Sequence, residues 1–157
     1  MASSHWIRRR LRSLRGLSAP RRALLVEAAL RLLAARAVLL FIPFPCLARR
    51  LGTFVPPSDP RVALGRSDSS TEHAAVAREI GWAVTTAARH VPFHAVCLPQ
   101  AMAARTMLKR RGVPSVIHFG AAKGADALDT HAWLDAAGLE VTGFPVGGQF
   151  AEIACFV

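Results

Sequence analysis

The chain has 157 residues, of which 52% are hydrophobic, and a formal net charge of +10. This length holds one domain core and hardly two, and the hydrophobic fraction excludes a disordered tail. The first fifty residues contain eleven arginines and one acid, Glu27, whereas the remaining residues carry nine basic and nine acidic side chains. An arginine-rich start suits nucleic acid, anionic lipid or an acidic partner, and charge alone does not separate these classes.

The three cysteines, Cys46, Cys97 and Cys155, are odd in number and show no CxxC spacing. This pattern favours neither a disulfide framework nor a zinc site, and we expect a reducing, cytoplasmic environment. No secretory signal is recognisable, because charged residues interrupt the apolar stretch after Arg22. The longest uncharged run there, residues 37–48, is shorter than the ~20 apolar residues that a membrane-spanning helix needs.

The first part of the chain predicts a basic arm followed by helix. Residues 1–19 are expected to be loosely ordered. Residues 20–52 are expected to form an apolar and basic helical segment, with Pro20 in its first turn and apolar residues at helical spacing. Pro43 and Pro45 should end the main helix, and a short continuation should end at Gly52. Residues 53–71 contain a group of prolines and predict a long loop.

Two further helices and three strands are predicted after that loop, within a protein core over 72–157. Ser70 or Thr71 should cap a helix over about 72–90, and a second helix should begin near Cys97 and end at Gly112. Residues 113–120, 130–135 and 139–143 are rich in β-branched or aromatic residues and predict strands, with a tight hairpin at Ala136–Gly138. The expected fold class is α+β: N-terminal helices, then a helix packed on a small antiparallel sheet.

The sharpest chemical pattern is a cysteine at a helix start followed by a histidine on a strand. A helix N-terminus carries partial positive charge that favours a thiolate, and a nearby imidazole can accept the thiol proton. Cys97 and His131 occupy these positions, so we predict that they are a catalytic pair. Such a pair is one that papain-like and transglutaminase-like cysteine enzymes use.

Other candidates fit the same chemistry less well. Cys46 lies in a proline-rich apolar turn and Cys155 in an apolar tail, so both are expected to be packed small hydrophobes. His118 is expected to be packed or solvent-facing, and His90 and His94 are secondary candidates because they flank the proline break before Cys97.

The segment CLPQAMAARTMLKRRGVPSVIHFG, followed by THAWLDAAGLEVTG, resembles the leader peptidase of lasso-peptide biosynthesis. This bacterial, transglutaminase-like cysteine protease is often called the lasso B protein. Family members typically read Cys-Leu, a helix ending in Arg-Arg-Gly, a strand finishing in Gly, and then His-Ala-Trp. The resemblance covers roughly residues 76–145, and the order of its pieces is more specific than any single piece.

The resemblance implies a papain/transglutaminase-like fold and removal of a leader from a ribosomally made peptide (a RiPP precursor). Cys97 would attack the carbonyl after the leader, His131 would move the proton, and neither metal nor cofactor would take part. Residues 1–90 lack the strands of a winged-helix recognition domain. The implied partners are therefore the precursor peptide, a separate leader-recognition protein and an ATP-dependent cyclase.

One departure from the family pattern concerns the group that orients the histidine. Many members place an aspartate about twelve residues after it, and here that residue is Gly143. Asp135 lies on the same strand and some 13 Å away by strand rise, too far to substitute. Thr142, Gln149, Glu152 or a main-chain carbonyl remain alternatives, as does a working dyad.

Two other functions stay open. The Gly143 departure suits a non-catalytic maturation scaffold of the same fold, and the basic N-terminal part suits an adaptor. For the arginine-rich arm we weigh a solvated tail, docking to partner proteins and interfacial membrane contact through residues 20–48. Nucleic-acid binding ranks last, because no recognition module accompanies the charge.

Overall fold

The computed structural model describes residues 16–67, 70–124 and 127–157. Most of the predicted basic arm, residues 1–19, lies outside these ranges. Ten elements follow in chain order. They are α2 (Ala19–Phe41), α3 (Phe44–Leu51), β1 (Phe54–Val55), α4 (Pro60–Ser67), α5 (Thr71–Ala88), α6 (Cys97–Lys109), β2 (Val116–Lys123), β3 (Leu128–Ala136), β4 (Leu139–Thr142) and β5 (Ala151–Phe156).

The predicted helices are confirmed, together with most of their boundary signals. Helix α2 has Pro20 in its first turn, and the chain leaves it just before Pro43. The side chain of Ser70 accepts a hydrogen bond from the backbone N–H of His73 at 3.1 Å, so it caps α5. Helix α6 begins at Cys97 as expected, and Gly112 follows its end with a positive φ of 70°.

The long loop predicted over residues 53–71 is wrong. Strand β1 lies at its start, and α4 begins at Pro60. The side chain of Asp59 accepts a hydrogen bond from the backbone N–H of Arg61 at 2.9 Å, which is the geometry of a helix cap. Pro60 therefore occupies the first helical position, where proline is favoured, rather than breaking the chain into a loop.

The sheet contains five antiparallel strands in the order β1-β5-β2-β3-β4. The three predicted strands correspond to β2, β3 and β4, and the predicted hairpin is confirmed by a turn at Ala137 and Gly138, whose φ angles are 52° and 71°. Strands β1 and β5 were missed. The C-terminal segment, interpreted as an apolar tail, pairs between β1 and β2, with Phe156 opposite Ile117.

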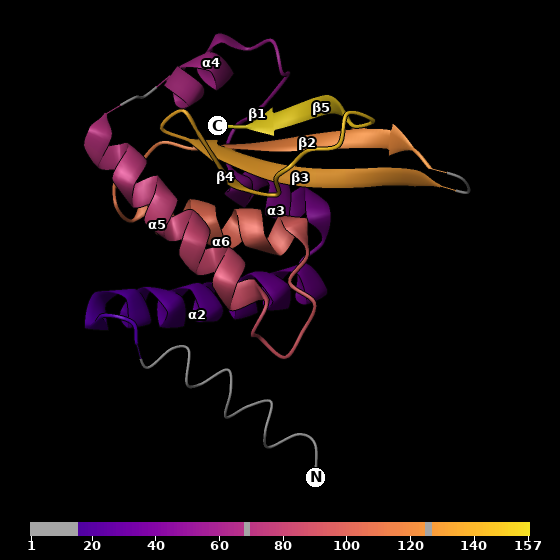
Figure 1. The fold of residues 1–157 in the computed structure, drawn as a ribbon. Helices are drawn as coiled ribbons and strands as arrows, with labels where there is room; N and C mark the ends of the chain where they lie inside the picture. The colour runs from indigo at the N-terminus through magenta and orange to yellow at the C-terminus, as the bar shows by residue number, and fades with distance from the viewer. Residues whose placement is uncertain (1–15, 68–69, 125–126) are drawn as a thin grey trace.

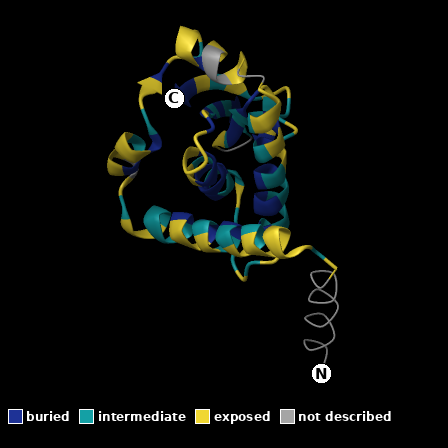
Figure 2. Cartoon of the chain, turned by 90° about the vertical axis from the view of Figure 1, so that its left-hand side faces the viewer, coloured by how far each residue is buried: buried dark blue, intermediate teal, exposed yellow. Residues whose placement is uncertain are grey.

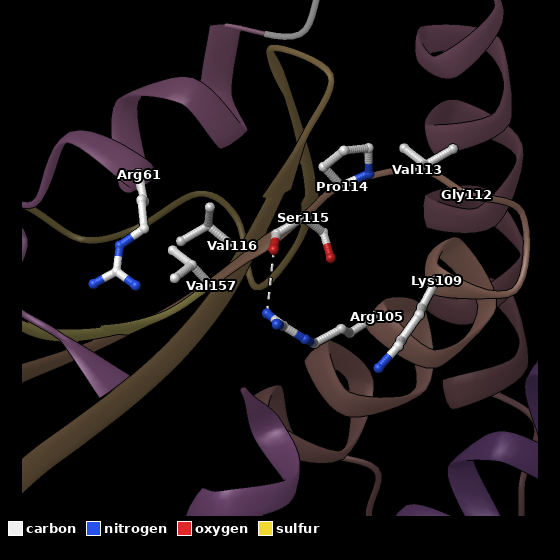
Figure 3. Close-up of a pocket in the computed structure, with 9 residues that line it drawn as sticks. All are labelled: Arg61, Arg105, Lys109, Gly112, Val113, Pro114, Ser115, Val116 and Val157. Atoms are coloured by element: carbon white, nitrogen blue, oxygen red, sulfur yellow. Dashed lines mark hydrogen bonds between the residues drawn. The ribbon is translucent and has the colours of Figure 1, made fainter. Parts of the chain in front are cut away.

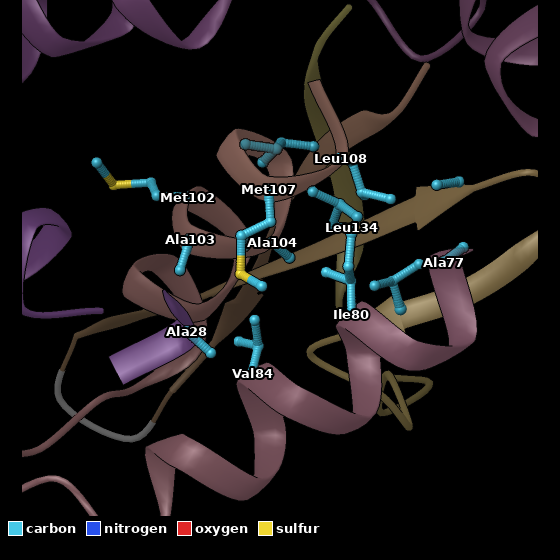
Figure 4. Close-up of a cluster of buried hydrophobic side chains, with 14 of the residues drawn as sticks. Ala28, Ala77, Ile80, Val84, Met102, Ala103, Ala104, Met107, Leu108 and Leu134 are labelled. Carbon is cyan, nitrogen blue, oxygen red and sulfur yellow. The ribbon is translucent and has the colours of Figure 1, made fainter. Parts of the chain in front are cut away.

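The two faces of the sheet have different environments. Helices α2, α5 and α6 cover one face, and α4 lies on the other (Figure 1). Leu134 of β3 joins Ile80 of α5 and Met107 of α6 in the main core (Figure 4). Burial is concentrated where these helices meet the sheet (Figure 2). The predicted α+β fold class, with helices on a small antiparallel sheet, is confirmed.

Candidate active site

Cys97 is the first residue of α6, and its side chain is partly exposed. The preceding residue, Val96, gives no side-chain cap, and the first turn of the helix contains no acidic residue. Neither the N-cap residue nor the first turn therefore supplies a side-chain acceptor for the backbone N–H groups at this helix start, and their partial positive charge lies beside the sulfur.

His131 lies on β3 opposite Gly120 of β2. The Nε2 atom of its ring lies 2.6 Å from the carbonyl oxygen of Gly143. Because a carbonyl oxygen can only accept a hydrogen bond, Nε2 carries the hydrogen and donates it. In the neutral ring Nδ1 then keeps its lone pair, so Nδ1 is the atom able to accept a proton.

Two aromatic rings hold the imidazole from its sides. The ring of Phe150 lies 5.2 Å from it and the ring of Trp133 lies 6.0 Å away, centroid to centroid. Contacts of this kind limit ring rotation, so the hydrogen bond to Gly143 and the two rings together fix the tautomer and the orientation.

The structure gives a physical reason for the missing aspartate. Gly143 has a φ of 83°, where side chains are rarely tolerated. A Cβ atom there would collide with the carbonyl oxygen of Ala132 and would lie 2.8 Å from Cα of Trp133. No aspartate fits at residue 143 with this backbone, and the main-chain carbonyl of the same residue accepts the hydrogen bond from His131 instead.

Among the described residues, the other sequence candidates for orienting His131 form no hydrogen bond with its ring. Asp135 and Glu152 contact His118, and the hydroxyl of Thr142 is buried without a hydrogen-bond partner among the described residues. Of the alternatives left open by the sequence, the main-chain carbonyl is the one found next to the ring.

Helix α6 lies along the sheet, with Cys97 at its first residue and Arg105 in its later part. Arg105 donates hydrogen bonds to the carbonyl oxygens of Ser115 at 3.1 Å and Phe156 at 2.7 Å, so the later part of α6 lies where β2 begins. Strand β3 runs antiparallel to β2. The start of α6 therefore lies toward the end of the sheet at which β3 begins (Figure 1).

The helix and strand bring Cys97 and His131 to the same end of the fold without a hydrogen bond between them. Strand alternation places His131 on the face of β3 that bears Trp133, opposite the face from which Leu134 enters the helix-covered core. In the described part of the chain, no hydrogen bond joins Sγ of Cys97 to the imidazole. Contact between thiol and ring therefore stays a prediction.

Sequence reasoning missed a cluster beneath α4. His118 is fully buried, its Nδ1 lies 2.5 Å from Oε1 of Glu152, and its Nε2 lies 3.2 Å from Oδ2 of Asp135 without hydrogen-bond alignment. Sγ of Cys155 lies 2.9 Å from Glu152, and the guanidinium of Arg66 lies 3.0 Å from Asp135. No local sequence signal marks this cluster, because it depends on the pairing of β5 with β2, which puts Cys155 opposite His118.

This cluster has the residue types of a cysteine–histidine–carboxylate triad, but its thiol and imidazole are not accessible to a substrate. The pKa of Cys155 is raised to about 12, first by burial and then by the hydrogen bond to Glu152, so its thiol stays protonated at neutral pH. The side chains of Cys155 and His118 are both fully buried. A substrate carbonyl cannot reach this sulfur, and the expectation that Cys155 is a packed residue is confirmed. The same expectation for Cys46 is wrong, because this residue lies exposed in α3.

The same cluster is where a metal ion could be held among the described residues. One ligand atom from each of His118, Glu152 and Cys155 lies within 4.8 Å of the others. The guanidinium of Arg66, however, lies 3.1 Å from Nδ1 of His118 and 3.5 Å from Glu152, so a positive charge already occupies this place. The arrangement is best described as a partly buried ion-pair network, built around the buried ring of His118, that fastens α4 to the sheet.

One cavity of the structure lies away from the predicted pair. Its volume is about 630 Å³, and its lining includes Arg61 of α4 together with Arg105 and Lys109 in the last part of α6 (Figure 3). Neither Cys97 nor His131 lines it. Arg105 is committed to the main-chain carbonyls of Ser115 and Phe156, and burial lowers its pKa. This cavity is therefore formed around a structural arginine and does not extend the candidate site.

The family model for the transglutaminase-like superfamily matches residues 38–155, which is more than half of the chain. The match includes α6 and all four of the longer strands, and so contains both Cys97 and His131. Searches of curated proteins and of solved structures give no match. In the described part of the chain, no helix is both long and apolar enough to cross a membrane. The chain belongs to the transglutaminase-like superfamily.

Proposed function

We propose that this protein is a cysteine peptidase that removes the leader from a ribosomally synthesised lasso-peptide precursor. The superfamily includes cysteine peptidases, and the resemblance of residues 76–145 to lasso leader peptidases supplies the substrate class. Cys97 is the nucleophile and His131 is the general base and acid.

The observation that carries the proposal is the state of the His131 ring. Its Nε2 donates to the carbonyl of Gly143, which leaves Nδ1 to accept the thiol proton. The nucleophile at the start of α6 lies toward the same end of the sheet, but on its helix-covered face, whereas His131 lies on the other face. The proposed proton transfer therefore requires the two side chains to approach each other at that end of the sheet. A carbonyl acceptor holds the ring as a carboxylate would, but it carries no full negative charge to stabilise the imidazolium.

The reaction follows from these roles. The proton of the Cys97 thiol passes to Nδ1 of His131, and the sulfur attacks the carbonyl at the end of the leader. Backbone N–H groups at the start of α6 stabilise the oxyanion. The imidazolium then protonates the departing amine of the core peptide. Water, deprotonated by the same ring, hydrolyses the thioester and releases the leader acid.

The proposed partners act before and after cleavage. A separate leader-recognition protein presents the precursor, and an ATP-dependent cyclase joins the newly freed α-amine to a carboxylate side chain. No cofactor is required by these steps, since each uses only the thiol, the imidazole and water.

The test is a cleavage assay with a precursor peptide and the recognition protein, followed by mass spectrometry. The wild type should release the leader, whereas Cys97→Ala and His131→Ala should reduce release by at least about a thousandfold. Cys155→Ala is the matched control, because that thiol is buried and should not contribute to the rate. Equal cleavage by the Cys97→Ala protein would overturn the assignment.

A non-catalytic maturation scaffold is the second candidate, and a specific observation favours it. His131 has no carboxylate partner, and no hydrogen bond joins its ring to Cys97 within the described residues. A scaffold predicts that Cys97→Ala supports normal product formation when precursor and cyclase are supplied. The peptidase predicts failure with intact precursor and normal product formation with a pre-cleaved core peptide.

A further inference from the structure

Helix α2 has a second apolar face that the fold does not bury. Val26, Leu30, Leu33 and Leu40 are between 54% and 63% exposed, and Phe41 is 83% exposed. The first four recur at spacings of four, three and seven residues, so they line one side of the helix. Figure 2 shows exposed positions recurring along the whole of α2.

The opposite side of α2 already anchors the helix to the protein. Ala28, Leu32 and Ala35 are buried in the main core against α5 and α6. The exposed stripe therefore adds apolar surface that the fold of this chain does not require. It continues into an apolar depression lined by Val26, Ala29, Val91 and other residues, with a volume of about 350 Å³. A continuous apolar surface of this kind marks an interaction site.

The charges around this stripe are unbalanced. Glu27, the one acid of α2, is paired with Arg111 at 2.7 Å, and Arg21 is paired with Glu79 at 2.6 Å. Arg22 lies one turn before Val26, and Arg36 lies between Leu33 and Leu40 along the helix. Neither arginine forms a salt bridge in the described part of the chain. Five more arginines precede residue 16 in the sequence.

We propose that the stripe formed by Val26, Leu30, Leu33, Leu40 and Phe41 docks α2 onto an anionic lipid membrane, parallel to its surface. The apolar side chains enter the boundary between headgroups and acyl chains, and Arg22 and Arg36 meet lipid phosphates. Charge complementarity selects this occupant, because an apolar stripe bordered by unpaired arginines suits a surface that is both apolar and negative. Membrane docking of α2 does not depend on the proposed peptidase activity.

The geometry limits how deep this contact goes. The charged residues of α2 and the burial of Ala28 and Leu32 against the protein keep the helix at the surface, in keeping with the lack of a membrane-spanning helix among the described residues. Docking through α2 leaves the sheet, on the other side of the helical layer, directed away from the lipid (Figure 1).

Sedimentation with lipid vesicles tests the proposal on the full chain. Wild type should bind vesicles of equal parts phosphatidylcholine and phosphatidylglycerol, and binding should weaken at about 0.5 M salt. Vesicles of phosphatidylcholine alone should bind roughly tenfold or more weakly. Leu30→Gln with Leu33→Gln should also reduce binding to the mixed vesicles by roughly tenfold or more. Arg22→Gln with Arg36→Gln should reduce it several-fold.

Two control variants distinguish an effect of the stripe from the loss of apolar surface or positive charge anywhere on the protein. Leu128→Gln with Ile153→Gln removes two apolar side chains of similar exposure from the sheet, and Arg78→Gln with Arg89→Gln removes the same charge from α5. Both should bind as wild type does. Unchanged binding by the Leu30→Gln, Leu33→Gln protein would overturn the proposal. So would a wild-type dimer that these two substitutions convert to a monomer without any vesicle binding.

Discussion

The three cysteines differ in what surrounds each sulfur, and this difference predicts their reactivity. Cys46 is exposed, Cys97 is partly exposed, and Cys155 is buried with a pKa of about 12. In a Cys46→Ser protein, iodoacetamide at neutral pH should modify Cys97 and leave Cys155 unmodified until denaturant is added. Peptide mapping by mass spectrometry gives the site. Labelling of Cys155 in the native protein at the rate of Cys97 would contradict this assignment.

The same reaction tests whether His131 acts on Cys97. If Nδ1 accepts the thiol proton, His131→Ala should slow alkylation of Cys97 by roughly tenfold at neutral pH, since the thiolate is the reacting form. His94→Ala is the matched comparison, because this exposed histidine is closer to Cys97 in sequence and was a secondary candidate for the same role. Equal slowing by both variants, or by neither, would show that the two predicted catalytic side chains do not interact in the free protein.

Gly143 and Gly112 form a matched pair for testing the carbonyl that orients His131. Both have a positive φ, but a Cβ at Gly112 meets no atom within 4 Å, whereas at Gly143 it collides with Ala132 and Trp133. Gly112→Ala should lower the free energy of unfolding by about 1 kcal/mol, and Gly143→Ala by about 2–4 kcal/mol. Urea denaturation measures both.

The consequence for activity separates the two glycines further. Gly143→Ala must displace the carbonyl that accepts from Nε2 of His131, so kcat should fall, while Gly112→Ala should leave it unchanged. A Gly143→Ala protein with full activity would show that this carbonyl does not position the ring.

Local residue patterns predicted part of the site and could not predict the rest. Cys97 at a helix start and His131 on a strand follow from the order of turn, helix and strand signals along the chain. An unspecified main-chain carbonyl was one of several alternatives, and that of Gly143 could not be singled out, because a main-chain acceptor leaves no mark in the sequence. The cluster of His118 with Cys155 was invisible, since it depends on pairing of strands far apart in the chain.

At the scale of elements, the helices and strands that were predicted correctly are those with clear start and stop residues in the sequence. Helices α5 and α6 have a cap at one end or a glycine at the other, and both were predicted. Helix α4 was missed because three prolines nearby outweighed the Asp59–Pro60 start, although proline in the first helical position is favourable. Strand β5 was missed because six residues between partners from distant segments carry little periodicity of their own.

The ion pair between Glu27 and Arg111 joins α2 to the end of α6 and should make stability depend on pH. The hydrogen bond from Arg111 lowers the pKa of Glu27, against the opposing effect of burial. The ionised pair therefore stabilises the fold above the ordinary glutamate pKa of about 4.3, and this contribution is lost as pH falls through the lowered value in the folded state.

Glu27→Gln measures that contribution. The substitution should lower the free energy of unfolding by about 1 kcal/mol at pH 7, and wild type and variant should converge once the pH falls below the lowered pKa of Glu27. Glu140→Gln, an exposed carboxylate without a salt bridge among the described residues, should change stability little at either pH. A pH-independent difference for Glu27→Gln would show that packing, and not charge, links the two helices.

At the scale of the whole molecule, the sequence suggested two separate segments, but the structure packs them against each other. Residues 20–52 were predicted as a helical segment distinct from a core over 72–157. Helix α2 nevertheless packs on both α5 and α6, and Leu32 is fully buried in the cluster that contains Leu134 of the sheet. Ion pairs from Arg21 and Glu27 join the same elements. We therefore expect α2 to unfold together with the sheet.

Leu32 and Leu33 are neighbours with opposite environments, and they test this expectation. Leu32→Ala removes a fully buried side chain and should lower the free energy of unfolding by about 2–4 kcal/mol, whereas Leu33→Ala, at 54% exposure, should cost less than about 0.5 kcal/mol. If α2 belongs to one cooperative unit, Leu32→Ala should shift a single urea transition, measured by tryptophan fluorescence and by circular dichroism, to lower concentration. If α2 is independent, circular dichroism should show an early loss of helix, while the fluorescence of Trp133 on β3, followed in a protein whose Trp6 and Trp82 are replaced by Phe, keeps its wild-type midpoint. Trp133 reports on the site itself, since its ring lies against His131. A shift of its transition in Leu32→Ala would therefore mean that the membrane-facing helix and the candidate catalytic strand share one folding equilibrium.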